Sequence, residues 1–361
     1  MNSIILRQFY RQKGYPAAQE DAAVRAVENL SHYLAASGKA LESAGIGDIR
    51  TYIARLTDRH ENSEDTLRAL ARYFYLTDKA EIYIYFTSLF GSRGVLEHIH
   101  RQLAEQEGEG TGREVFCGLE TPPLGTPPEE LPSLLTCRLM HRLAACLPPE
   151  RYRKALAGNN HEIPAESYLD EKRRYEEAAS LNDYLKDLHV RKVAELQRHC
   201  DERKIWFEQE ITQEVVDFAA ANQEILSAVR KGNRLYVTKI PYDTVKYLRA
   251  KCPAEKKYYL CHCPFVRSVF LNSEEESGKE AALPAAPAEA PASAEVRASA
   301  EVPVSAISSV PADWCYCSAG FEKHPFEVIF GMALDVELLE SPLMGHDRCR
   351  FAVILPPERI K

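Results

Sequence analysis

Hydrophobic and polar positions alternate with a helical period through the first hundred residues. Residues 19–37 carry aliphatic side chains three and four positions apart, and similar stripes recur over residues 47–59 and 63–78. Ser63 lies at the start of the third stripe, where its hydroxyl can cap the first turn of a helix. The helical pattern continues to residue 107. We therefore predict a helical bundle over residues 1–107.

The pattern then changes twice before residue 232. Residues 108–133 are rich in glycine and proline, which predicts a linker without regular structure. Helical spacing resumes at residue 134 and continues, with a high density of charge, to a stop at Gly232. We predict a helical domain over residues 134–232, built from long helices with solvated outer faces.

After Gly232 the hydrophobic period shortens and mixes strand with helix. Residues 234–238 alternate like a strand and precede a short helix, and residues 256–266 alternate like a second strand. A helix is expected over residues 318–332. The segments "ALDVELLESPL" and "CRFAVILP", joined by "MGHDR", predict a two-stranded hairpin at the end of the chain.

A compositionally biased segment interrupts this C-terminal part. Ala, Pro, Glu and Ser dominate residues 273–312, and large apolar residues are scarce, so we predict a disordered insert. The expected fold class is α+β. It comprises an N-terminal helical bundle, long central helices, and a mixed α/β domain over residues 233–361 with an antiparallel sheet.

The composition of the chain argues against two classes of binding partner, nucleic acids and membranes. The formal net charge of −8 argues against a dedicated nucleic-acid surface. No run of apolar residues is long enough for a membrane helix, and the first residues lack a signal-peptide pattern, so we expect a cytoplasmic protein. In that compartment the ten cysteines should be reduced.

Two C-x-C pairs flank the predicted insert, Cys261 with Cys263 and Cys315 with Cys317. Long insertions are tolerated where their two ends lie close together, so we expect the pairs to approach each other in space. Residues i and i+2 of a strand share a face, and four thiols would then converge. Four thiolates suit zinc or an iron–sulfur cluster.

Other interpretations of these thiols stay open. The C-x-C spacing differs from the C-x(2–4)-C spacing of structural zinc sites, and cysteine is among the most buried residue types. The four thiols are therefore metal ligands, pocket-lining core residues, or groups with redox or nucleophilic chemistry. In the nucleophilic case Cys317 would attack, and His324 or His262 would act as the base.

The N-terminal segments "VRAVENLSHYLAASGK", "GDIRTYIARL" and "TLRALARYFYL" resemble the helical core-binding domain of tyrosine recombinases. The remaining chain lacks the Arg, His-x-x-Arg and Tyr constellation of the recombinase catalytic domain. The resemblance therefore implies a fold or a partner-binding module. It suggests, at most, a DNA-binding helical protein without recombinase activity.

The C-terminal order "CHCPF", "WCYCSAGF" and "GHDRCRFAVILP" resembles the 4-vinyl reductase domain, a small-molecule-binding fold. It also resembles the related family named for L-2-amino-thiazoline-4-carboxylic acid hydrolase. This implies an α/β domain with a pocket between helix and sheet. Its functional positions would be Cys315, Cys317, Glu340, Asp347 and Cys349. Residues 160–264 further resemble a family of uncharacterised bacterial proteins through "HEIP", "ELQRHC", "WFEQ", "TKIPY" and "CHCPF".

Three functions follow from these observations. The first is a small-molecule- or metal-binding sensor or scaffold with a cysteine-rich C-terminal site. The second is a hydrolase that acts on a C–N or C–S bond of a small heterocycle. The third is DNA binding by the helical half. We prefer the first, because no nucleophile, base and orienting group can be assembled from the sequence alone.

Overall fold

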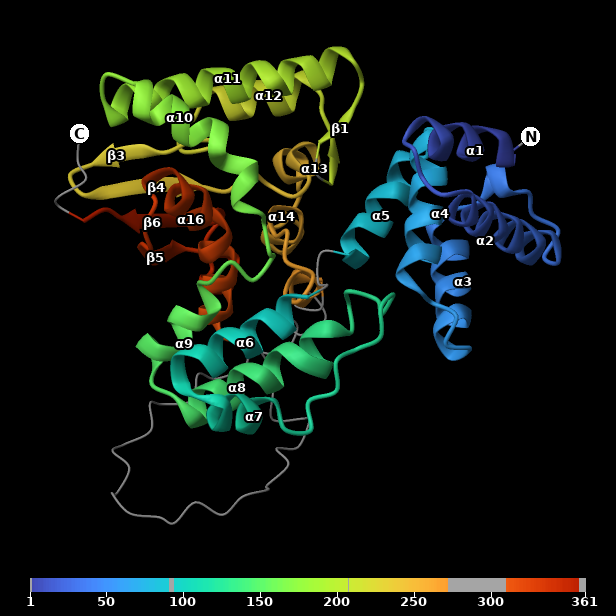
Figure 1. Cartoon of the computed structure of the whole chain (residues 1–361), viewed down its shortest axis with the longest axis horizontal. Coiled ribbons are helices and arrows are strands. Elements are labelled where there is room, and N and C mark those ends of the chain that lie inside the picture. Colours follow the sequence, from blue (N-terminus) through green and yellow to red (C-terminus); the bar gives the residue numbers. More distant parts are fainter. Residues whose placement is uncertain (1, 91–93, 207, 272–309, 357–361) are drawn as a thin grey trace.

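The computed structural model describes residues 2–90, 94–206, 208–271 and 310–356. The predicted α+β class is confirmed: helices dominate the described chain, and its two antiparallel sheets lie in the second half. None of the described helices is both long enough and apolar enough to cross a membrane. Figure 1 shows the first helices at one side of the molecule and the sheet at the other.

The N-terminal helices pack around one hydrophobic core, as their apolar stripes predict. Leu30, Ile53 and Phe74 are fully buried at its centre. Ser63 caps its helix, and its hydroxyl accepts a hydrogen bond from the Thr66 amide at 3.2 Å. The helices are α1 (Asn2–Gln12), α2 (Ala17–Ala35), α3 (Ile46–Asp58), α4 (Glu64–Leu76) and α5 (Ala80–Phe90).

A second core begins at Val95, so the first bundle ends earlier than the predicted residue 107. Helix α6 packs with the middle helices, and its partners include Trp314 and Phe265 from the C-terminal part. The predicted linker, residues 108–133, contains a helix whose Val115 is buried. The prediction of an irregular segment is therefore wrong for residues 109–116. The middle helices are α6 (Val95–Glu107), α7 (Glu109–Phe116), α8 (Cys137–Cys146) and α9 (Pro149–Leu156).

The predicted run of helix up to Gly232 is interrupted. Helix α11 ends at Asp201, and residues 205–210 form a small hairpin in which Trp206 pairs with Gln209. Ile205 and Trp206 favour strands, but the charges around them resemble a helical surface in the sequence. The elements here are α10 (Leu169–Glu177), α11 (Leu181–Asp201), β1 (Ile205–Trp206), β2 (Gln209–Glu210) and α12 (Gln213–Ala220).

A four-stranded antiparallel sheet has the order β3-β4-β6-β5. Leu235 on β4 pairs with Val353 on β6, and both are buried against α11 and α16. The predicted C-terminal hairpin is confirmed by the antiparallel pairing of β5 with β6. The strands are β3 (Val229–Lys231), β4 (Arg234–Thr238), β5 (Asp335–Glu340) and β6 (Arg350–Ile354).

The second predicted strand, residues 256–266, is wrong. Helix α14 occupies Pro253–Leu260, and the thiol of Cys252 accepts a hydrogen bond from the amide of Glu255 at its start. Residues 261–263 have no regular structure. The other C-x-C pair is helical, with Cys315 in a 3₁₀ turn and Cys317 in the first turn of α16 (Tyr316–Phe330). A short helix, α13 (Thr244–Arg249), precedes α14.

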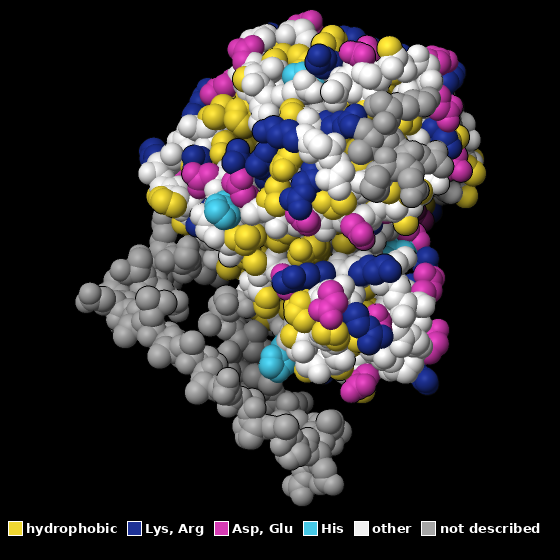
Figure 2. Space-filling view, turned by 90° about the vertical axis from the view of Figure 1, so that its left-hand side faces the viewer, with side chains coloured by type: hydrophobic (Ala, Val, Ile, Leu, Met, Phe, Trp, Pro, Cys, Tyr) yellow, Lys and Arg dark blue, Asp and Glu magenta, His cyan; other side chains and the backbone are white. Residues whose placement is uncertain are grey.

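The predicted disordered insert, residues 273–312, lies outside the described residues as far as residue 309. Its described end is ordered: Val310 is buried, and a 3₁₀ turn starts at Ala312. Phe270 and Val310, on the two sides of the undescribed segment, belong to the same hydrophobic core. On the face shown in Figure 2, Lys and Arg lie among acidic and hydrophobic side chains, so that face has no uniform positive surface.

Candidate functional site

The two C-x-C pairs meet in the core, as the position of the insert predicts. The indole N–H of Trp314 donates a hydrogen bond to the Cys263 thiol at 3.2 Å and so joins the two segments. The charge of an ionised Cys315 would raise the pKa of Cys261, and the charge of an ionised Cys263 would raise the pKa of Cys315. The three sulfur atoms therefore lie near one another. The two pairs are therefore neighbours, through turns and helix rather than through paired strands, but the convergence of all four thiols on one metal stays a prediction.

Burial keeps these thiols protonated at neutral pH. Desolvation raises the pKa of Cys317 to about 12, and it also raises the pKa of Cys261, Cys263, Cys315 and Cys349. Among the residues that the structure describes, no group of three or more His, Cys, Asp or Glu side chains is arranged to hold a metal ion. Zinc or an iron–sulfur cluster stays a prediction.

The two histidines predicted as bases have different surroundings. His324 lies inside α16, where Nε2 is 3.0 Å from the Ile163 carbonyl oxygen. His262 bridges two segments: Nδ1 is 3.2 Å from Glu208 Oε2, and Nε2 is 2.7 Å from the Ile240 carbonyl oxygen. Both nitrogens of His262 face acceptors. Neither offers a lone pair to a substrate while these contacts hold.

The pocket residues inferred from the family resemblance do not share one site. Glu340 forms an ion pair with Arg348 at 2.6 Å, and Asp347 is exposed and pairs with Lys256 at 3.0 Å. Cys349 is buried in a small apolar cluster with Phe351. None of the three lines the cavity that lies between the sheet and the helices packed on it.

That cavity, which we call the central cavity, has a volume of about 550 Å³. Residues of α10, α11, β4 and α16 line it, so the sheet forms one wall and helices form others. Of the candidate residues, His262, Cys263 and Cys317 line it. The aromatic side chains that line it are Tyr168, Tyr184, Trp206, Phe265, Phe321 and Phe326.

One charged pair stands out in the central cavity. Lys239 follows β4 and Glu322 lies on α16, and the Lys239 ammonium is 3.8 Å from Glu322 Oε1. Only 14% and 20% of these side chains are accessible, and both border the cavity. The ammonium also lies 4.6 Å from the ring centre of Phe321. Neither the Lys239 ammonium nor the Glu322 carboxyl group makes a hydrogen bond to another described residue.

Burial and nearby charge act in opposite directions on the acids of the cavity. Desolvation raises the pKa of Glu322, and the charges of Lys239 and His262 only partly oppose it. Desolvation would also raise the pKa of Glu208. There the hydrogen bond and charge of His262 prevail, so the pKa of Glu208 falls below its ordinary value. Two carboxyl groups of one cavity thus differ in proton affinity.

A thiol and an imidazole meet at another point of the wall. Cys317 Sγ is 3.9 Å from His161 Nε2. The His161 side chain is exposed, but its accessible surface borders the cavity. Desolvation, with a contribution from Lys239, lowers the pKa of His161 to about 4. Thiol and imidazole are therefore both neutral at pH 7.

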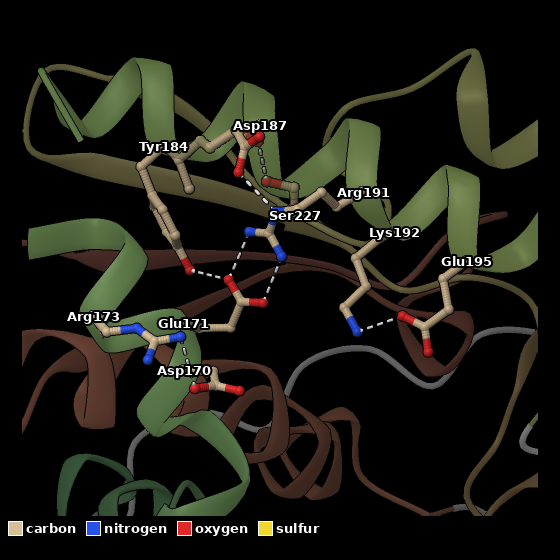
Figure 3. A network of polar contacts seen from close by, with 10 residues as sticks. Asp170, Glu171, Arg173, Tyr184, Asp187, Arg191, Lys192, Glu195 and Ser227 are labelled. Carbon is tan, nitrogen blue, oxygen red and sulfur yellow. Dashed lines mark hydrogen bonds and ion pairs between the residues drawn. The ribbon is translucent and has the colours of Figure 1, made fainter. Parts of the chain in front are cut away.

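A polar network fixes the helical wall opposite α16 (Figure 3). Arg191 on α11 donates two hydrogen bonds to Glu171 on α10, at 2.7 and 2.8 Å, and the Tyr184 hydroxyl donates a third at 3.2 Å. Burial opposes ionisation of Glu171, but the hydrogen bonds and charge of Arg191 hold its pKa low. This bidentate pair orients α10 against α11.

Sequence reasoning missed the charged residues of the central cavity. His161, Glu208, Lys239 and Glu322 come from four segments that are distant along the chain. A signal was present nevertheless. Four of the five segments that resemble the bacterial family, "HEIP", "WFEQ", "TKIPY" and "CHCPF", each contribute a residue to the lining.

The fold and the cavity together define an α+β protein with a ligand-sized internal site. Residues 304–360 match the model of a family described as "Family of unknown function (DUF6144)". Within this match the structure describes α16, β5 and β6, and α16 supplies Cys317 and Glu322 to the cavity. No curated protein and no solved structure matches the chain.

Proposed function

We propose that the protein binds a small organic molecule in the central cavity. The observation that carries this proposal is the pair of Lys239 and Glu322, which face an aromatic-lined space without other hydrogen-bond partners among the described residues. Sites for small molecules usually have volumes of about 300–1,000 Å³. The cavity's volume of about 550 Å³ fits that range.

The lining indicates the chemistry of the ligand. Trp206, Phe265 and Phe326 offer apolar faces to a flat or aromatic body. Lys239 can donate to an anionic or carbonyl oxygen. Glu322, with its raised pKa, can accept a hydrogen bond from the ligand or donate one. The ligand should therefore carry a polar end on an apolar body. The resemblance to the small-molecule-binding 4-vinyl reductase domain supports the same proposal.

Binding of an amphipathic fluorescent probe tests this proposal. Anilinonaphthalene sulfonate has an aromatic body and an anionic end, and its fluorescence can be titrated against the full chain. The variant Lys239→Met should bind it about tenfold more weakly, since a hydrogen bond to a charged group is lost. Lys186→Met, on the exposed side of α11, is the matched control and should bind normally. Equal affinity of all three proteins would contradict the proposal.

Hydrolysis is the second candidate function, and the contact between Cys317 and His161 favours it. A nucleophilic thiol needs a substantial thiolate fraction. The raised pKa of Cys317 opposes this, so the binding function is better supported. Iodoacetamide labelling at pH 7 separates the two functions. The hydrolase requires that Cys317 reacts as fast as the exposed Cys117, whereas a binding protein should protect it.

The metal-binding form of the proposal has its own test. Elemental analysis of protein purified without added metal should find about one zinc or several irons per chain if the thiols hold a metal. Metal-free protein with a normal circular dichroism spectrum would reject that form and leave the small-molecule form intact.

A further inference from the structure

A second cavity lies between the N-terminal bundle and the rest of the chain. It has a volume of about 500 Å³, and we call it the inter-core cavity. Arg50 on α3 and Tyr85 on α5 line one side. Tyr242, Tyr258 and Arg267 line the other, close to α13 and α14. Neither the proposed function nor any of the family resemblances uses this space.

Arg267 is the unusual group of the inter-core cavity. Its side chain is only 5% exposed, and its guanidinium carbon lies 3.9 Å from the ring centre of Tyr242 and 5.3 Å from that of Tyr258. Its Nη1 has no hydrogen-bond partner among the described residues, and no described carboxylate forms an ion pair with it. A buried cation is costly unless an anion and acceptors accompany it. The geometry lacks an acceptor at this point.

The acidic residues of the cavity do not fill that role, because each has its own partner or is exposed. Glu129 pairs with Arg50 at 2.7 Å, Asp243 pairs with Lys246 at 3.2 Å, and Glu208 contacts His262 at 3.2 Å. The remaining two, Glu81 and Glu210, are exposed to solvent, which screens their charges. Glu208 is within range of the charge of Arg267, but it contacts His262 instead, so Arg267 has no ion-pair partner among the described acids of the cavity.

We propose that the inter-core cavity binds a small organic oxyanion through Arg267. A carboxylate or phosphate group can accept two parallel hydrogen bonds from a guanidinium, which matches the fork geometry of arginine. The tyrosine rings that hold the guanidinium in place also provide flat surfaces for an aromatic or apolar body. Such a ligand would neutralise the buried charge. It would also connect the bundle to the rest of the chain.

The experiment is a set of calorimetric titrations of the full chain at constant ionic strength. The probes are sodium benzoate, inorganic phosphate, and benzamide as the neutral counterpart of benzoate. Wild-type protein should bind at least one of the two anions. Tighter binding of benzoate indicates a carboxylate ligand, and tighter binding of phosphate indicates a phosphate ligand. It should not bind benzamide with comparable affinity. Binding should also raise the melting temperature with the logarithm of ligand concentration, once that concentration exceeds the dissociation constant.

Three variants locate the site. Arg267→Met should weaken anion binding at least tenfold, because a charge-assisted bidentate contact is lost. Arg267→Lys keeps the charge without the fork and should give an intermediate affinity, and it serves if the Met variant does not fold. Arg249→Met makes the same change on the exposed side of α13 and should bind like wild type. The absence of binding by wild type, or equal binding by Arg267→Met, would overturn the proposal.

Discussion

The replacement Gly320→Ala tests the close approach of α16 to the end of α9. Gly320 lies on α16, and its Cα faces the end of α9. A Cβ at this position would lie 2.5 Å from the carbonyl carbon of Ala157 and 2.6 Å from its oxygen, and closer still to the Gly158 oxygen. Ordinary contacts begin near 3.4 Å, so the two backbones would have to separate by about 1 Å.

The expected cost follows from the rigidity of these neighbours. All three atoms belong to the backbone, so no side chain can rotate away. Helix α16 is also held by the sheet through Phe326 and Ile329. Overpacking of this kind costs about 1–3 kcal/mol, and the better helix propensity of alanine returns about 1 kcal/mol at most. We expect a net loss of about 1–2 kcal/mol.

Urea unfolding followed by circular dichroism measures this loss as a lower midpoint at an unchanged slope. The control is Gly47→Ala in α3, where no atom lies within 4 Å of the new Cβ. There the same change should stabilise the protein by about 0.4–1 kcal/mol, because it restricts the unfolded chain. A Gly320→Ala protein as stable as wild type would refute the close approach of α9 and α16.

Two further predictions concern half-buried charges in other parts of the fold. Glu224 accepts hydrogen bonds from Arg350, at 2.7 Å twice, and from the Thr238 hydroxyl. Burial raises the pKa of Glu224, but these contacts outweigh burial and lower it. The ionised carboxylate therefore stabilises the folded protein above about pH 4.5, and this stabilisation is lost as the pH falls further. Glu224→Gln should cost about 3 kcal/mol at pH 7 and flatten the acid limb of stability between pH 3 and 5, measured by urea unfolding. An unchanged acid limb would contradict this. Arg72 donates to the hydroxyls of Tyr10 and Tyr15 at 2.7 and 2.9 Å, so Arg72→Met should cost about 2 kcal/mol in thermal unfolding, and no loss would show that this contact is only superficial.

The N-terminal helices could be predicted because each has one buried and one solvated face. Leu30 and Ile53 lie at helical spacing from other aliphatic residues, and Ser63 marks a helix start by its chemistry alone. The C-terminal hairpin was predictable for a similar reason. Its strands have enough apolar residues to fix one buried side, and "MGHDR" contains the glycine that a turn needs.

The error at residues 256–266 shows where this reasoning fails. Tyr259, Cys261, Cys263 and Phe265 alternate with other residues as they would in a strand. Pro253 at the first helical position decides the local structure instead. The charged residues of the central cavity could not be found by period or spacing. Lys239 and Glu322 are indistinguishable from surface residues until the fold brings them within 3.8 Å.

The carboxylate of Glu208 lines the central cavity and the inter-core cavity alike. It lies at the boundary between the two spaces, and its proton affinity responds to Lys239 on one side and Arg267 on the other. Occupation of either space by a charged molecule must change the electrostatic potential at this shared wall. Thermodynamic reciprocity then requires each occupant to alter the dissociation constant of the other by the same factor. Under the two binding proposals, an affinity measured in one cavity should therefore be given at a stated occupancy of the other.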